Sequence, residues 1–313
     1  MDDFFNPTNE PQPPSEAPLQ PEVQSESQFP PIAQTRPEQA RPSPWGVWAT
    51  LGWAILVGIV FSIAQAAVVA VFTVMAYLDN PKLDSVQLIK SFESNGFLLS
   101  VAVCASSLAS GLVTILAARQ RWPGTARASM SPEAATPEAA STNTPPVSWL
   151  YTWRHYLALR PVSLKTLLPW LGALCLFAVA SDLLTYSLGR PIVPDFMQKA
   201  YGTARFLPLL WMAVVIFGPV FEELFFRGFL FRGLAESKLG AVGTILITSL
   251  LWASIHLQYD AYGIFLVFVA GLLLGWTRVR TDSIYPPIAM HCLMNFIATT
   301  EAALQHSGLL NIP

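Results

Sequence analysis

The 313-residue chain is 53% hydrophobic and only 12% charged, about half the charged share of a soluble domain. The net charge of −2 says nothing about nucleic acid, but the sequence has no basic stripe of the kind that such binding needs, so we expect no nucleic-acid partner. Cys104, Cys175 and Cys292 lie singly in apolar segments, so we expect buried thiols rather than a disulfide or zinc framework. The composition predicts an integral membrane protein, in contact with the lipid bilayer.

The N-terminal region, residues 1–44, is predicted to be a disordered, proline-rich cytoplasmic tail. Its first 40 residues hold nine prolines and seven acidic residues against one arginine. Such a segment buries too little apolar surface to offset the entropy of ordering. Two apolar stretches follow, from Trp45 to Tyr77 and from about Gly96 to Ala118, and each is long enough to cross a bilayer. We therefore expect residues 45–118 to form two transmembrane helices.

Residues 119–166 are predicted to form a low-complexity cytoplasmic loop, because Ala, Pro, Ser, Thr and Glu dominate its centre. The remainder, residues 167–313, is predicted to be a transmembrane core that opens with a span at about Leu167–Leu188. Four further apolar segments follow at about 207–232, 241–258, 261–279 and 284–303. Gly271 and Gly275 form a G-x-x-x-G pair, which favours close helix approach. The predicted fold class is all-α, a polytopic transmembrane helix bundle of about seven spans.

Basic residues give this bundle an orientation. With seven spans, one set of connecting regions carries thirteen Lys and Arg residues and the other set carries five. The basic-rich set contains the N-terminal tail, and basic loops stay on the cytoplasmic side of a membrane. We therefore predict a plasma (inner) membrane protein with a cytoplasmic N-terminus.

Two adjacent carboxylates, Glu222 and Glu223, interrupt an apolar segment. Placing an acidic side chain at a bilayer centre costs roughly 2.5–3.5 kcal/mol, so each glutamate is expected to have a stabilising partner or a function. Glu223 and Arg227 are four residues apart on one helical face and can pair, which leaves Glu222 without that partner. A desolvated, unpaired carboxylate suits proton transfer at neutral pH. The alternative is a helix-end salt bridge beside a spare glutamate that snorkels to the interface.

The last predicted spans carry His256, His291 and Asn295. His291 and Asn295 are four residues apart and share a helical face. A single histidine in a span is more often a hydrogen-bonded packing residue, but here two histidines and an asparagine accompany Glu222. At 1.5 Å per residue, the four side chains lie at depths of about 11–24 Å from the predicted cytoplasmic helix ends. We expect them to converge on one cavity that opens toward the cytoplasm.

This group of residues fits the activation of water. A carboxylate and an imidazole together deprotonate a water, while a second histidine and an amide donate to a developing oxyanion. A zinc site built from Glu222, His256 and His291 is the alternative, since two His and a Glu are a known catalytic ligand set. The H-E-x-x-H motif of many zinc proteases is absent, so no cofactor is firmly predicted.

Three motifs in this order resemble those of the CAAX protease and bacteriocin-processing (CPBP, or Abi) family of intramembrane proteases. They are Glu222-Glu223-x-x-x-Arg227, Trp252-x-x-x-His256 and His291-x-x-x-Asn295. The resemblance covers about residues 205–300. Trp252 stands where the family more often has phenylalanine.

The resemblance implies an intramembrane endopeptidase of the CAAX prenyl protease type that acts on membrane-associated proteins or peptides. By analogy, Glu222 and His256 would activate water, and His291 and Asn295 would form the oxyanion hole. Glu223, Arg227 and Trp252 would support the site. The family has been described both as metal-dependent and as a glutamate-type protease. Two other functions stay open: a non-catalytic immunity or scaffold protein of the same fold, and an ion or proton transporter.

Overall fold

The computed structural model describes residues 45–309, apart from residues 83, 94 and 121–148. The predicted tail (1–44) and the centre of the predicted loop (119–166) therefore lie outside the described residues. The described part of the chain folds into helices and contains no strand, which confirms the all-α prediction.

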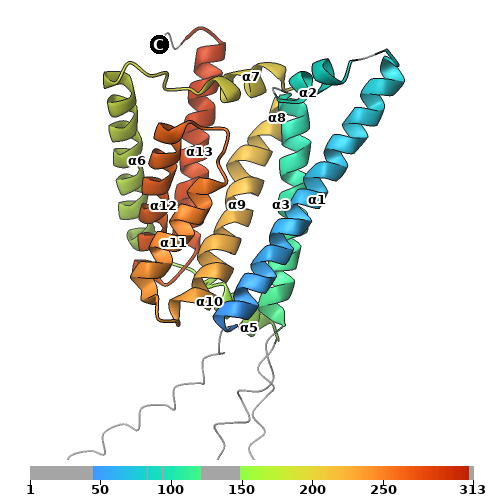
Figure 1. The fold of residues 1–313 in the computed structure, drawn as a ribbon. Helices are drawn as coiled ribbons and strands as arrows, with labels where there is room; N and C mark the ends of the chain where they lie inside the picture. Colours follow the sequence, from blue (N-terminus) through green and yellow to red (C-terminus); the bar gives the residue numbers. More distant parts are fainter. Residues whose placement is uncertain (1–44, 83, 94, 121–148, 310–313) are drawn as a thin grey trace, which may run out of the picture. The chain divides into compact units, whose positions relative to one another are not determined.

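Figure 1 shows these helices in a bundle. In chain order they are α1 (Val47–Asp79), α2 (Ser85–Glu93), α3 (Gly96–Arg119), α5 (Trp149–Tyr156), α6 (Leu164–Ser187), α7 (Asp195–Thr203), α8 (Leu207–Trp211), the π-helix η3 (Met212–Phe217), α9 (Gly218–Glu223), the π-helix η4 (Leu224–Leu230), α10 (Phe231–Ala235), α11 (Gly240–Ser254), α12 (Ala261–Thr281) and α13 (Tyr285–His306). The segments from α8 to α10 follow one another without a break and form one long helix.

Five segments of the described chain are long and apolar enough to cross a membrane: α1, α3, α6, the helix from α8 to α10, and α12. They confirm an integral membrane protein. α11 has 15 residues, fewer than the roughly 20 that a span needs, although it runs beside α12 in the bundle (Figure 1). The count of seven spans stays a prediction.

The outer helices present apolar side chains to their surroundings. On α1, Ile55 and Ile63 are largely exposed, and on α6 so are Leu176 and Leu183. Large exposed apolar surfaces are unfavourable in water and are the normal exterior of a protein in lipid. α1 and α6 therefore face hydrocarbon.

The two ends of the bundle differ in charge. α5, α10 and the start of α1 lie at one end, and α2 and α7 lie at the other (Figure 1). We call the first the basic end, because the helix ends and connections there carry Arg119, Arg160, Lys165, Lys238 and Arg280. We call the second the α7 end.

Glycines let α11 and α12 pack closely, as the G-x-x-x-G pair predicts. A Cβ atom added at Gly271 would lie 2.9 Å from Cβ of Ser249, and one at Gly275 would lie 3.0 Å from Cγ2 of Ile245. Both distances leave no room for a larger residue. The backbone of α12 at Gly271 consequently lies against α11 and within reach of the helix from α8 to α10.

We predict that Gly271→Ala destabilises the bundle by about 1–3 kcal/mol, because the added methyl overpacks Ser249. Gly172→Ala is the matched control, since nothing lies within 4 Å of a Cβ added at that position of α6. The control should leave stability unchanged or raise it slightly, because alanine favours a helix interior. Thermal melting of both purified variants in detergent measures the difference. Equal melting temperatures would contradict the close packing.

Candidate active site

A buried ion pair holds the first motif together. Arg227 Nη1 donates to Glu223 Oε1 at 2.8 Å, and both side chains are completely buried. This confirms the pairing expected from their helical spacing. The same Glu223 oxygen lies 3.0 Å from Nδ1 of His291 on α13. A carboxylate only accepts, so His291 Nδ1 carries a proton and donates to Glu223.

Arg227 also connects its helix to α11 and α12. Its Nη2 donates to the carbonyl of Gly271 on α12 at 3.2 Å. Its guanidinium lies over the ring of Trp252 on α11, 4.7 Å from the ring centre. Its own carbonyl accepts a hydrogen bond of 3.1 Å from Nε of Arg278. The desolvated charge thus gains stabilisation from α11 and α12 as well as from Glu223.

Glu222 is the exposed member of the carboxylate pair, with 22% of its side chain accessible. Its Oε2 accepts a hydrogen bond of 2.5 Å from the indole nitrogen of Trp252. The same oxygen lies 3.9 Å from Nε2 of His291. His291 therefore sits between the two glutamates, with one ring nitrogen facing each of them.

Trp252 is the centre of the site. Its side chain is 1% exposed, and its ring meets the rings of His256 and His291 edge to face, each at a centroid distance of 5.1 Å. Together with the contacts to Glu222 and Arg227, this ring fixes the relative positions of four motif side chains. The hydrogen bond from the indole N–H holds the Glu222 carboxylate in one orientation.

His256 lies just beyond the end of α11, which finishes at Ser254 rather than at the predicted residue 258. Its Nδ1 is 2.7 Å from the carbonyl of Trp252. Because a carbonyl only accepts, Nδ1 carries the proton and Nε2 holds a lone pair. Tyr259 stacks on the ring, with centroids 6.1 Å apart. Burial raises the pKa of Tyr259, and the charge of Glu222 raises it further, so the phenol stays protonated.

One cavity of about 170 Å³ receives three of the four predicted catalytic side chains. Glu222, His256 and Asn295 line it, while His291 contacts Glu222 from outside the lining. The other lining residues are Leu99, Val103, Phe196, Met197, Ala213, Val214, Gly218, Pro219, Gln258, Tyr259 and Ala298.

The cavity lies toward the α7 end, because its lining includes α7, the first turns of α3 and the connection between α11 and α12. The basic end, predicted to be cytoplasmic, is opposite (Figure 1). A cytoplasmic basic end and a cavity that opens toward the cytoplasm are therefore two predictions that exclude each other. Depths counted along ideal helices misplaced His256, which lies in a connection.

Asn295 faces the same cavity from α13. Its Nδ2 donates to the carbonyl of Val214 in η3 at 2.8 Å. An amide nitrogen carries two N–H groups, so this bond fixes the side chain and still leaves a second donor. His291 and Asn295 share a helical face, as predicted, but they hold different partners.

The motif region matches a family of known proteins. Residues 204–297 match the family model described as Rce1-like, type II CAAX prenyl endopeptidase. The match supports the resemblance of this region to the CAAX protease family. The matched residues agree closely with the predicted range of 205–300. No curated protein and no solved structure matches the chain.

The predicted zinc ligands Glu222, His256 and His291 hydrogen-bond to protein groups. Among the residues that the structure describes, no three His, Cys, Asp or Glu side chains come together as metal ligands would. Nδ1 of His256 donates to the Trp252 carbonyl, and Nδ1 of His291 donates to Glu223. Both rings therefore keep Nε2 as the nitrogen open to a proton, a water or a metal, an arrangement that metal-binding histidines also have.

The sequence did not predict three members of the candidate site. Tyr259 stacks on His256 from an irregular connection, so no helical spacing marked it. The Val214 carbonyl belongs to a π-helix, and backbone groups leave no signal in a sequence. Arg278 was visible only as a basic residue at the end of a span, whereas it is buried and bonds to the Arg227 carbonyl.

We predict that the two glutamates contribute differently to stability. Glu223→Gln leaves the buried Arg227 without its carboxylate, and removing one partner of a buried pair costs about 3–5 kcal/mol. Glu222→Gln is the matched control, because the residue is partly exposed and the amide oxygen still accepts from Trp252. Melting temperatures in detergent should fall strongly for Glu223→Gln only. Similar losses in both variants would mean that the pair acts as one structural cluster.

Proposed function

We propose that the protein is an intramembrane endopeptidase of the CAAX prenyl protease type. It hydrolyses peptide bonds in membrane-associated proteins or peptides, with Glu222 and His256 activating the water. The observation that carries this proposal is the single small cavity lined by Glu222, His256 and Asn295, with Trp252 holding the Glu222 carboxylate. The family match to residues 204–297 supports the same class of enzyme.

In the proposed reaction, a water binds between the Glu222 carboxylate and His256 Nε2. Both groups accept hydrogen bonds, so together they orient the water and take its proton as the oxygen attacks the peptide carbonyl. Glu222 then returns the proton to the leaving amine. The backbone bond at Nδ1 keeps the His256 lone pair on Nε2 throughout.

The oxyanion of the tetrahedral intermediate receives donors from α13. The second N–H of Asn295 is one donor, held in place by the bond to Val214. His291 Nε2 is the other donor in this scheme, in the form of the ring that carries a proton on both nitrogens, and it lies 3.9 Å from Glu222 Oε2. Glu223 and Arg227 are positioning residues in this scheme, because they act through His291 and Trp252.

The decisive experiment measures peptide cleavage by the purified full-length protein. Substrates are a farnesylated CAAX peptide and its unprenylated counterpart, each with and without a metal chelator. Removing a general base typically lowers turnover by about 10²–10⁴-fold. Glu222→Gln should show such a loss, whereas Glu236→Gln, a substitution at an exposed glutamate, should not. Turnover should persist in chelator.

Three outcomes would contradict this proposal. Full activity of Glu222→Gln would show that Glu222 is not the base that activates the water. Loss of activity in chelator that zinc restores would assign a metalloprotease mechanism instead. A folded wild-type protein that cleaves neither peptide, and no other membrane peptide supplied, would favour the non-catalytic scaffold.

Asn295→Ala should lower kcat by about 100- to 1000-fold while KM stays within a few-fold, because an oxyanion donor acts only in the transition state. Thr299→Val is the control: Thr299 lies one turn further along α13 and its hydroxyl bonds only within the helix, to the Asn295 carbonyl. Steady-state kinetics and melting temperatures of both variants separate catalysis from folding. Near-normal kcat with a greatly raised KM would move Asn295 to the substrate-binding surface.

A further inference from the structure

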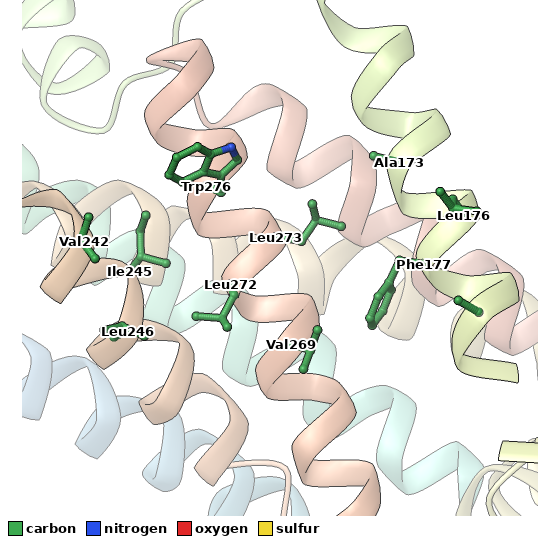
Figure 2. A pocket seen from close by; sticks show the side chains of 11 residues that line it. Ala173, Leu176, Phe177, Val242, Ile245, Leu246, Val269, Leu272, Leu273 and Trp276 are labelled. Carbon is green, nitrogen blue, oxygen red and sulfur yellow. The ribbon is translucent and has the colours of Figure 1, made fainter. Parts of the chain in front are cut away.

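A second cavity, of about 600 Å³, lies on the outer surface of the bundle between α6, α11 and α12. Figure 2 shows that α12 forms its floor with Val269, Leu272, Leu273 and Trp276, while α6 and α11 form the two walls. Every lining side chain is apolar, and Trp276 contributes the only heteroatom. None of its residues lines the catalytic cavity.

The cavity runs in the direction of a lipid tail and is long enough for part of one. Trp276 lies five residues before the end of α12, and Val269 lies seven residues further from that end. At 1.5 Å per residue the floor is about 10 Å long and runs inward from near the basic end. One leaflet of hydrocarbon is about 15 Å thick. A chain entering from the headgroup region of that leaflet would run along this floor.

Three cations lie at the basic end of the helices that line the groove. Lys165 begins α6, Lys238 precedes α11, and Arg280 is in the last turn of α12, so each of the three helices that line the groove contributes one. All three side chains are exposed. The Arg280 guanidinium lies 5.8 Å from the ring centre of Trp276, which lines the groove. Positive charge and apolar surface therefore meet at one place.

The opposite ends of the same helices lack this excess of positive charge. There, beyond the end of α6 and at the start of α12, Arg190 forms an ion pair with Asp260. The Gly263 backbone N–H and Arg190 both donate to Asp260 and hold the pKa of its carboxyl below the usual value, so it stays ionised. An anionic headgroup is attracted to the basic end only.

We propose that this groove binds one acyl chain of an anionic glycerophospholipid, with the lipid phosphate placed among Lys165, Lys238 and Arg280. Charge complementarity selects the anionic headgroup, and the apolar walls select the chain. The bound lipid fills the space between α6 and the α11–α12 pair. The proposal does not depend on the protease activity.

The test is native mass spectrometry of the full-length protein in detergent, titrated with palmitoyl-oleoyl phosphatidylglycerol or with the matching phosphatidylcholine. Each Lys or Arg near an anionic lipid surface contributes a factor of about five in affinity. We expect phosphatidylglycerol to bind more tightly than phosphatidylcholine, and Arg280→Gln to weaken its binding by about fivefold. Arg205→Gln removes an exposed arginine from the α7 end and should have no effect.

A second pair of variants tests the groove itself. Ala173→Phe combined with Ala180→Phe fills the wall formed by α6 and should abolish the tightly bound lipid. Val179→Phe adds a phenyl ring at an exposed, non-lining position of α6 and should leave the lipid bound. Equal binding of the two lipids, or retention of phosphatidylglycerol by the filled groove, would overturn the proposal. Displacement of phosphatidylglycerol by a farnesylated peptide would also overturn it and assign the groove to the substrate.

Discussion

The buried ion pair between Arg227 and Glu223 is the interaction on which the rest of the site depends. Two charges in a low-dielectric interior are stable only when further hydrogen bonds offset their desolvation. Here those bonds come from His291 on α13 and the Gly271 carbonyl on α12, and the ring of Trp252 on α11 adds a cation–π contact. Satisfying one charged pair therefore requires α11, α12 and α13 to meet the helix that carries the glutamates.

The contacts around this ion pair also position the side chains of the candidate catalytic cavity. Once His291 is bound to Glu223, its other nitrogen faces Glu222, which is adjacent in sequence. Once Trp252 lies under Arg227, its N–H reaches Glu222 and its carbonyl engages His256. Glycine at position 271 is needed for the same reason, because a side chain there would push α12 away from Ser249 and Trp252. Charge burial and close packing thus position the same few side chains.

Local features of this fold were predictable from the sequence, and long-range contacts were less so. The helix ranges agree within a few residues for most segments, since apolar stretches and helical spacing are local properties. The Glu223–Arg227 pair also depends only on spacing within one helix. By contrast, the partner of Asn295 is a backbone carbonyl of η3, and His256 lies outside a helix. Hydropathy contains no information about either.

The two π-helices also made side-chain directions near the glutamates hard to predict from the sequence. α9, which carries the glutamates, lies between η3 and η4. In a π-helix each residue rotates the chain by a smaller angle than in an α-helix. Side-chain directions predicted at 100° per residue are therefore correct within α9 and become less accurate beyond its two ends. Pro219, which has no backbone N–H to donate, follows the junction of η3 and α9, where Gly218 and Pro219 line the cavity. Irregular helix geometry commonly marks functional sites in membrane proteins and elsewhere.

The two cavities lie toward opposite ends of the bundle, and this links orientation to function. The proposed lipid groove lies between helices that carry Lys165, Lys238 and Arg280 at the basic end, whereas the proposed catalytic cavity is lined by α7 and the start of α3. In the orientation that the basic residues predict, the groove faces the cytoplasmic leaflet and the catalytic cavity faces the other side of the membrane. Substrates would then reach Glu222 from the outer leaflet. Labelling a cysteine introduced at Asp195, on α7, from outside intact cells would establish that direction; labelling only after the cells are opened would place the catalytic cavity on the cytoplasmic side.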